Sequence, residues 1–302
     1  MVRPLIIGTR DSALALRQTE LAVEALRAAS PALELQITPL RTEGDRRADV
    51  SLEQIGGEGV FVKDIERALL EHRIDLAVHS LKDMPPALPP GLTIGAVLPR
   101  GDARDALVGH GGAALSALRR HATVGTDSRR RAVQLLALRH DLLPTSVRGN
   151  VDTRVRKAES GALDAVVLAL AGLQRLSLEA RASQVFSVDE LLPAVGQGVL
   201  AIEAREDDAE LLDLLHQVDD ADTHAAIRAE RAYLQRLGAG CKLPVAAYGE
   251  LDEGRLRLRA LLAGVDGNIH REELLGPPAD AEAMGAALAE LLMARAGIEA
   301  AP

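Results

Sequence analysis

The sequence has very few aromatic residues and a single cysteine. Its 302 residues include no tryptophan, two phenylalanines, two tyrosines and one cysteine, Cys241. With so few rings the chain cannot offer a row of aromatic side chains on which the bases of a single-stranded nucleic acid would stack. One cysteine excludes a disulfide framework and a cysteine-rich metal site, which fits a reducing compartment. The hydrophobic core must be aliphatic.

Long apolar runs and a positive net charge are also missing. No run reaches the roughly 18 apolar residues that a membrane helix needs, and the N-terminal apolar stretch is too short for a secretory signal. The net charge is -9, with 44 acids against 35 bases. This is the wrong sign for non-specific binding to nucleic acid or anionic lipid. We therefore expect a cytoplasmic protein with no nucleic-acid partner and no membrane partner.

Strand and helix patterns alternate through the first two thirds of the chain. Strand-like Leu5 to Ile7 leads through a polar turn, in which Asp11 or Ser12 can cap a helix, into an amphipathic helix from Ala13 to Ala29. The order strand, turn, helix occurs in residues 5–29 and again in residues 122–138. The order helix, apolar strand occurs in residues 64–79 and again in residues 153–170. Two copies of one pattern predict two α/β units with parallel or mixed sheets.

The C-terminal third breaks this alternation. A helix from His224 to Leu237 precedes a glycine-rich loop around Cys241, two strands joined by a turn at 252–254, and a last helix from about Asp280 to Ala296. This order predicts a small α+β domain. We interpret the apolar run 191–204 as a strand that returns to the first unit. The predicted domains are residues 1–98 plus 199–217, residues 99–198, and residues 218–302.

Positive charge gathers in one segment. Residues 119–157 hold ten bases against three acids, and Arg129, Arg130 and Arg131 stand at the start of a predicted helix. The helix dipole disfavours cations there unless an anion is bound. A solvated helix face would explain any single arginine, but for the group we favour an anion pocket. Because arginine can bind a carboxylate through two parallel hydrogen bonds, a ligand with several carboxylates fits well, while phosphate ligands stay open.

Asp83 is a candidate for chemistry. It follows an apolar strand that ends at His79, and it precedes Met84, which must be extended because a proline follows. Asp83 is therefore expected on a stiffened loop at a strand end, where α/β sheets bind ligands. A turn or capping role is the alternative. We expect His79 to be packed or hydrogen-bonded rather than a ligand.

Cys241 is the second candidate. Glycines on its N-terminal side predict a tight, accessible loop, and the adjacent Lys242 favours the thiolate, which is the nucleophilic form. The alternative is an inert buried thiol.

Eight motifs, in order along essentially the whole chain, resemble the porphobilinogen deaminase family. They are GTRDSALAL, GGEGVFVKDIE, DLAVHSLKDMP, GTDSRRR, VRGNVDTR, LALAGLQRL, LPAVGQG and GAGCKLPV. The resemblance implies an α/β fold of three domains. The first two would resemble a type II periplasmic binding protein with the site in the cleft between them, and the third, a small α+β domain, would bear the cofactor cysteine. It also implies a monomeric transferase of porphyrin and haem biosynthesis that condenses four porphobilinogen molecules into hydroxymethylbilane and releases ammonia.

The resemblance assigns roles to individual residues. Cys241 would hold a dipyrromethane cofactor through a thioether, and Asp83 would be the catalytic carboxylate, protonating the leaving amine and stabilising the cation that forms. The cofactor would also contact Lys82, Thr126, Ser128, Arg130, Arg131 and Arg154, and the substrate would contact Arg10, Ser12, Arg148 and Arg175. No metal is implied.

Some positions depart from the family pattern, and a rival function exists. Glu43, Gln54 and Glu58 stand where the family often has bases, which weakens any claim that this segment grips the product. The rival is a non-catalytic binding protein for a small polycarboxylate, which a two-lobed architecture would suit equally. Cys241 separates the two, because a plain binding protein has no use for a covalently loaded thiol.

Overall fold

The computed structural model describes residues 4–42, 62–238, 243–264 and 267–298. Contacts divide the chain into two units, which are Met1–Arg100 with Val199–His224, and Gly101–Gly198 with Ala225–Pro302. We call them unit 1 and unit 2. Since the C-terminal residues group with 101–198, the boundaries of the three predicted domains stay a prediction.

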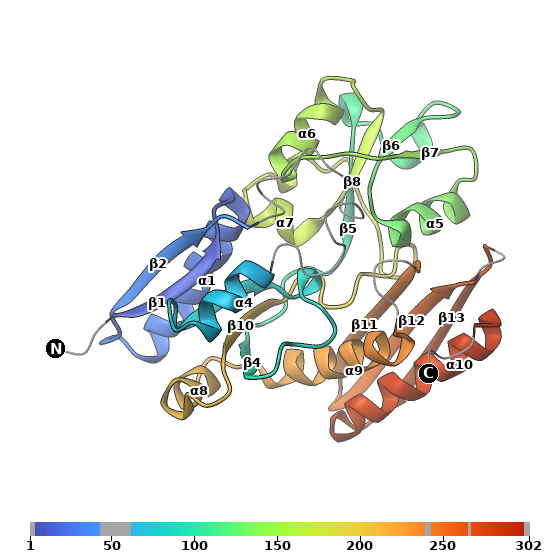
Figure 1. Ribbon diagram of the computed structural model, residues 1–302. Coiled ribbons are helices and arrows are strands. Elements are labelled where there is room, and N and C mark those ends of the chain that lie inside the picture. Colours follow the sequence, from blue (N-terminus) through green and yellow to red (C-terminus); the bar gives the residue numbers. More distant parts are fainter. Residues whose placement is uncertain (1–3, 43–61, 239–242, 265–266, 299–302) are drawn as a thin grey trace. The chain divides into compact units, whose positions relative to one another are not determined.

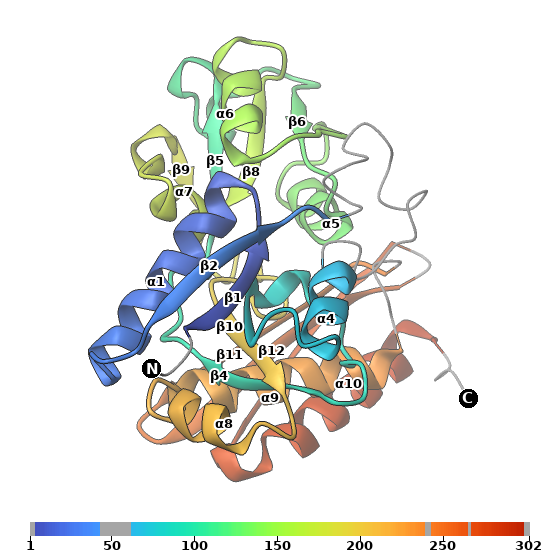
Figure 2. The same ribbon diagram turned by 60° about the vertical axis from the view of Figure 1, so that its left-hand side comes forward.

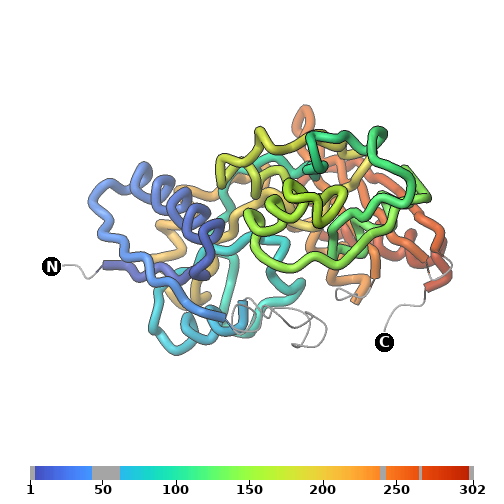
Figure 3. The backbone as a smooth tube through the Cα atoms, turned by 90° about the horizontal axis from the view of Figure 1, so that it is seen from above, coloured from blue at the N-terminus to red at the C-terminus, as the bar shows by residue number. Residues whose placement is uncertain are grey.

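A five-stranded mixed sheet forms the centre of unit 1 (Figure 1). Its order is β2-β1-β3-β10-β4. Strand β1 pairs in parallel with β2 and β3, and β10 runs antiparallel to β3 and β4. The strands are β1 Leu5–Arg10, β2 Leu35–Leu40, β3 Leu76–Ser80, β4 Leu92–Val97 and β10 Leu200–Arg205. Unit 1 is thus completed by a late segment of the chain, seen in Figure 3 as gold tube among blue.

Helices cover both faces of this sheet (Figure 2). Helices α1 (Ala13–Ala29) and α8 (Ala209–His216) share one apolar cluster with strand residues such as Leu76 and Ile202. Helix α4 (Lys63–Leu70) packs on the opposite face through Ile65 and Leu69, against Ala77 and Leu92. The alternation of side chains along β3 therefore separates two cores.

Unit 2 repeats this sheet. The strand order is β7-β6-β8-β5-β9, with β6 parallel to β7 and β8, and β5 antiparallel to β8 and β9. The strands are β5 Asp105–Gly109, β6 Thr123–Gly125, β7 Leu143–Thr145, β8 Ala165–Ala169 and β9 Gln184–Val185. Helix α5 (Arg129–Leu138) covers one face, and α6 (Val151–Glu159) with α7 (Leu170–Arg175) covers the other. The matching order confirms the predicted pair of α/β units.

The first helix of each unit begins at a serine. The Ser12 Oγ accepts a hydrogen bond from the Ala15 N–H at 3.3 Å, and the Ser128 Oγ accepts one from the Arg131 N–H at 3.4 Å. Each hydroxyl satisfies a backbone donor that the first helical turn leaves without a partner. The cap at Ser12 and the helix from Ala13 to Ala29 are as predicted.

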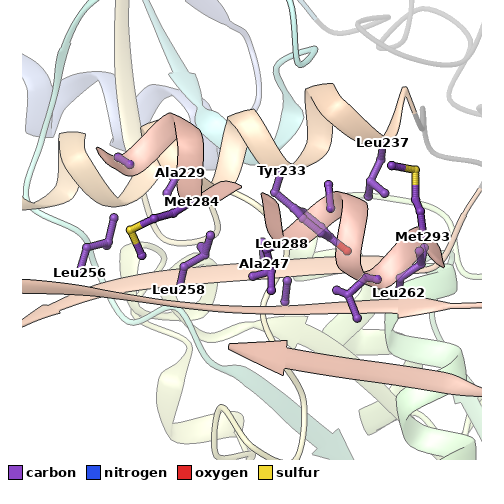
Figure 4. Close-up of a cluster of buried hydrophobic side chains, with 14 of the residues drawn as sticks. Ala229, Tyr233, Leu237, Ala247, Leu256, Leu258, Leu262, Met284, Leu288 and Met293 are labelled. Atoms are coloured by element: carbon purple, nitrogen blue, oxygen red, sulfur yellow. The ribbon is translucent and has the colours of Figure 1, made fainter. Parts of the chain in front are cut away.

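The C-terminal part of unit 2 is an α+β layer, as predicted. Helices α9 (Ala221–Leu237) and α10 (Ala281–Ala296) pack on one face of an antiparallel sheet. Its strands, in order, are β11 Val245–Asp252, β12 Arg255–Ala263 and β13 Ile269–Gly276. Figure 4 shows the resulting core, in which Tyr233 is the one aromatic residue among aliphatic and methionine side chains. The Tyr233 hydroxyl donates to the Leu261 carbonyl oxygen at 2.9 Å, so the ring's one polar atom is satisfied within the core.

The strand predicted over residues 191–204 is wrong in its N-terminal part, because β10 begins only at Leu200. Gly196 and Gly198 have φ angles of 69° and 89°, in the left-handed region that no regular strand contains. The Gly196 N–H donates at 2.7 Å to Glu230, a buried side chain of α9. The segment is therefore an irregular connection fastened to the C-terminal layer.

The fold class predicted from the sequence is confirmed: two α/β units of matching strand order and a small α+β layer. In the described part of the chain, no helix combines the length and the apolar character that crossing a membrane requires.

Candidate active site

A short turn after β3 presents Asp83. The turn η1 (Leu81–Asp83) exposes Lys82 and Asp83 and buries Leu81 and Met84. Met84 is extended, with φ -81° and ψ 145°, as predicted. The Leu81 N–H donates to the Val199 carbonyl oxygen at 3.1 Å, and the Asp83 carboxylate has no hydrogen bond or ion pair with any described residue. The turn therefore fixes the position of Asp83, while its carboxylate makes no hydrogen bond or ion pair with the described residues.

Arg10 and Ser12 lie at the same edge of the sheet of unit 1. Strands β1 and β3 are parallel neighbours, so their carboxyl ends meet at one edge. Arg10 ends β1 and Ser12 caps the helix that follows, while Lys82 and Asp83 follow the end of β3. The structure therefore brings four of the predicted residues to one edge.

Thr126 and Ser128 occupy the equivalent edge of unit 2, after β6. The buried Thr126 accepts a hydrogen bond at its Oγ1 from the Ser128 N–H at 3.1 Å, and Ser128 is the cap of α5. Both hydroxyl oxygens thus shape the turn, while each O–H can still donate to a ligand oxygen.

Arg130 and Arg131 are buried and bind an internal carboxylate. Asp105, the first residue of β5, is 0% exposed. Its oxygens lie 2.8 Å from Arg130 Nη1 and 2.7 Å from Arg131 Nη2. Although burial opposes ionisation, the two guanidinium groups hold the pKa of Asp105 well below its usual range. The anion expected at this helix start is therefore supplied in part by the protein itself.

Sequence reasoning missed Asp105 and Gln197. The Gln197 amide donates to the Asp105 Oδ1 at 2.9 Å and to the Ala103 carbonyl oxygen at 2.7 Å. A signal for Asp105 was available, because an acid that opens the otherwise apolar strand DALVG needs a buried cation as partner. Nothing in the sequence placed Gln197 beside it.

Three further arginines of unit 2 differ in whether their guanidinium groups already bind other residues of the protein. The half-buried Arg148 has a guanidinium without a hydrogen bond or ion pair to the described residues. The Arg154 Nε donates to the Gly149 carbonyl oxygen at 2.7 Å. The Arg175 Nη2 donates to the Gly198 carbonyl oxygen at 2.6 Å, and burial lowers the pKa of Arg175 to about 10. Arg175 is thus engaged at the point where the chain returns to unit 1.

The remaining predicted site residues lie outside the described ranges. These are Cys241, expected to bear the cofactor, and Glu43, Gln54 and Glu58.

The described residues fit a ligand that bears carboxylates. The Arg148 guanidinium has N–H donors that no described residue accepts, and the buried Arg130 Nε has no hydrogen-bond partner among the described residues. The hydroxyls of Thr126 and Ser128 can also donate. Carboxylates accept from such donors and bind arginine in a bidentate manner. In the described part of the chain no group of three side chains could hold a metal ion. Fold and site are those expected of an α/β protein that binds anionic small molecules at the carboxyl ends of its strands.

Comparison with protein families and with related sequences shows which kind of α/β protein this chain is. The family model described as "Porphobilinogen deaminase, dipyromethane cofactor binding domain" matches residues 5–213, and "Porphobilinogen deaminase, C-terminal domain" matches residues 224–294. A porphobilinogen deaminase from Syntrophotalea carbinolica is 49% identical over 96% of this chain and 93% of its own. One from Roseiflexus is 48% identical over 98% of both chains.

This chain belongs to the porphobilinogen deaminase family. The predicted activity, condensation of four porphobilinogen molecules into hydroxymethylbilane with release of ammonia, is the activity of this family, and dipyrromethane is its cofactor. The assignment confirms the resemblance seen in the sequence and decides against a plain binding protein.

Solved structures with a similar backbone include the second substrate binding domain of a putative amino acid ABC transporter from Streptococcus pneumoniae. It is 13% identical, with a TM-score of 0.44, over 72% of this chain and 92% of that chain. A periplasmic domain of BvgS from Bordetella pertussis is 14% identical, with a TM-score of 0.40, over 71% of this chain and 86% of that chain.

Proposed function

We propose that Asp83 is the catalytic carboxylate of this chain. Loss of ammonia from porphobilinogen requires a proton on the departing amine and leaves a cation delocalised over the pyrrole ring. A carboxyl group beside that ring can donate the proton and then, as a carboxylate, stabilise the cation and accept the proton released when the new carbon–carbon bond forms. The observation that carries the proposal is the exposed, uncommitted Asp83 carboxylate on a turn whose neighbours are buried.

Cys241 is proposed as the thioether anchor of the dipyrromethane. When bound, the cofactor supplies a permanent primer to which each new pyrrole is added. Its carboxylates are assigned to Lys82, Thr126, Ser128, Arg130, Arg131 and Arg154, and those of the incoming substrate to Arg10, Ser12, Arg148 and Arg175. The proposed task of these side chains is to bind and orient carboxylates.

The hydrogen bonds and ion pairs that these arginines already make within the protein refine their assignment to cofactor or substrate. Arg130 and Arg131 already bind Asp105, so their role toward the cofactor rests on the Arg130 Nε and on the net positive charge of two guanidinium groups around one carboxylate. Among the arginines assigned to carboxylates, Arg148 is the one whose guanidinium has no hydrogen bond or ion pair to a described residue, which makes it the strongest of them for a new carboxylate.

The wider setting is proposed on the same basis. The protein works as a cytoplasmic monomer of three domains, with porphobilinogen as its partner and neither nucleic acid nor membrane. Few aromatic residues and an acidic net charge argue against nucleic-acid and membrane partners, and a single cysteine fits a reducing compartment.

Asp83→Asn tests the catalytic assignment. The amide keeps the size of the side chain but can neither hold nor release the proton, so turnover is expected to fall by about 10²-fold or more, with the cofactor mass retained. The matched control is Glu24→Gln, an exposed carboxylate on α1 of the same unit, which should keep normal turnover. Turnover of Asp83→Asn within a few-fold of wild type would remove Asp83 from this role.

A further inference from the structure

Three titratable side chains are buried together beneath helix α4. Glu66, His79 and Glu203 are 3%, 6% and 0% exposed. The His79 Nε2 lies 3.0 Å from the Glu203 Oε2, which fulfils the expectation that His79 is hydrogen-bonded. The Glu66 Oε1 and Glu203 Oε1 are buried and have no hydrogen-bond partner among the described residues. We call these three residues the buried acid cluster.

Each member comes from a different element of unit 1. Glu66 lies on α4, His79 on β3 and Glu203 on β10. In the antiparallel register His79 is opposite Ala201, so Glu203 is its diagonal neighbour on the same face. That face is the one covered by α4, as the positions of α4 and β10 in Figure 2 illustrate. The cluster therefore joins the helix to two adjacent strands.

The positive groups around Glu66 are too few to balance its negative charge in addition to that of Glu203. Glu203 from β10 opposes its ionisation, while His79 from β3 and Lys63 from its own helix favour it. Arg205, two residues further along β10, donates to the carbonyl oxygens of Leu69 and Ile74 and is paired with the carboxylates of Asp75 and Asp208.

The other strands facing α4 offer little compensation. They bring apolar Ile6 from β1 and Leu92 from β4. By alternation Arg10 ends β1 on this same face. Burial and the nearby Glu203 charge together raise the pKa of Glu66 to about 7. Glu66 itself therefore gains a negative charge near neutral pH.

The cluster lies next to the turn that carries Asp83. His79 is four residues before Asp83, and only Ser80 separates it from η1. The Leu81 N–H of this turn donates to the Val199 carbonyl oxygen, directly before β10. The two strands that the His79–Glu203 contact joins are therefore the two that hold the turn in place.

We propose that Glu66, His79 and Glu203 are positioning residues for the reaction: the charge on Glu66 determines how firmly the ends of β3 and β10 hold the turn that carries Asp83. With Glu66 neutral, the space under α4 holds no additional buried charge from Glu66, the His79–Glu203 contact is kept, and the turn is tight. With Glu66 ionised, an uncompensated charge under α4 loosens the packing of the strands. The consequence for turnover rests on the proposed role of Asp83, whereas the consequence for the turn does not.

Amide hydrogen exchange of the loaded enzyme tests the proposal through peptides that cover residues 76–84. After correction for the intrinsic pH dependence of exchange, wild-type protection is expected to be about tenfold lower at pH 8 than at pH 6, because the neutral fraction of Glu66 falls about tenfold, from about 0.9 to about 0.1, between these pH values. Glu66→Gln, which cannot ionise, should show equal protection at both pH values. Equal protection in the wild type, or the same loss in Glu66→Gln, would overturn the proposal.

Glu203→Gln is the second variant, and it removes one of the two causes of the raised pKa. Its loss of protection should occur at least about half a pH unit lower than in the wild type, and an unchanged midpoint contradicts the cluster. Glu71→Gln is the matched control, since Glu71 is an exposed glutamate at the end of the same helix. It should behave as the wild type does.

Kinetics connect the cluster to the reaction. The ratio of kcat between Glu66→Gln and wild type should be near 1 at pH 6 and rise to about threefold at pH 8, while the KM ratio stays constant. A kcat ratio that is the same at both pH values would show a purely structural role. If Asp83→Asn keeps turnover but the exchange result holds, the proposed role of Asp83 fails and the control of the turn stands.

Discussion

Replacing Asp105 by Asn removes the charge that two buried arginines share, while it keeps the shape of the side chain. The carboxylate is fully buried and lies 2.8 Å and 2.7 Å from the guanidinium groups of Arg130 and Arg131, which are 5% and 7% exposed. Without Asp105, two cations remain in the interior with no anion between them. Breaking a buried pair in this way costs about 3–5 kcal/mol, which is about a fifth or more of a typical folding stability of about 5–15 kcal/mol.

Urea denaturation at pH 7 measures this cost. Asp102→Asn is the matched control, because Asp102 lies three residues before Asp105 and pairs with the half-exposed Arg104. An ion pair of that kind contributes about 0–1 kcal/mol. If Asp105→Asn costs less than about 1 kcal/mol, or no more than the control, the buried network does not stabilise the start of α5 as we reason.

The pH dependence of the same pair has a definite sign. The arginines lower the pKa of Asp105 below its ordinary value of 3.8, so its contribution is present above pH 4 and is lost as the pH falls toward the folded-state pKa. The difference between wild type and Asp105→Asn should therefore be constant from pH 5 to 8 and shrink in acid. A difference that grows in acid contradicts this assignment.

Two further changes have expected outcomes. Glu66→Gln should raise the free energy of unfolding by up to about 3 kcal/mol at pH 8 and leave it unchanged at pH 4. Glu66 keeps its proton up to about pH 7 in the folded protein but releases it near pH 4.5 in the unfolded chain. The free energy of unfolding of the wild type therefore falls as the pH rises between these values. Urea denaturation of both proteins at pH 4 and pH 8 measures the difference. Gly198→Ala should lower the unfolding free energy by about 1–3 kcal/mol, because φ is 89° and the new Cβ would lie 2.6 Å from the Gly101 carbonyl oxygen; thermal unfolding measures it.

Each of these has a contradicting result. A Glu66→Gln effect of equal size at pH 4 and pH 8 would show that ionisation is not its cause. A neutral Gly198→Ala would show that the connection between the units tolerates a side chain.

Sequence periodicity predicted the fold where one face of an element is apolar. The helix from Ala13 to Ala29 was located at both ends, since its apolar spacing and its serine cap agree. The strand β13 was missed, because its residues IHREELLG are largely charged and alternate between half-buried and exposed. The strand predicted from residue 191 failed because an apolar run carries no information about φ, and the glycines at 196 and 198 break it.

The candidate site was predictable only where motifs mark it. Asp83 and the serine caps follow strand ends, which a linear pattern can reveal. The partners of buried charges could not be found in this way. Asp105 is 26 residues from Arg131, and Glu203 is 124 residues from His79, so only the folded sheets bring them together. An acid inside an apolar strand signals that a partner exists but does not say which residue it is.

The intact mass of the purified protein is the most direct test of the central claim, that Cys241 holds a two-ring primer on which the chain grows. The account predicts a wild-type mass that exceeds the sequence mass by one dipyrromethane, and a Cys241→Ala variant that has the bare sequence mass and no activity. An active wild-type protein with the unmodified mass would contradict it.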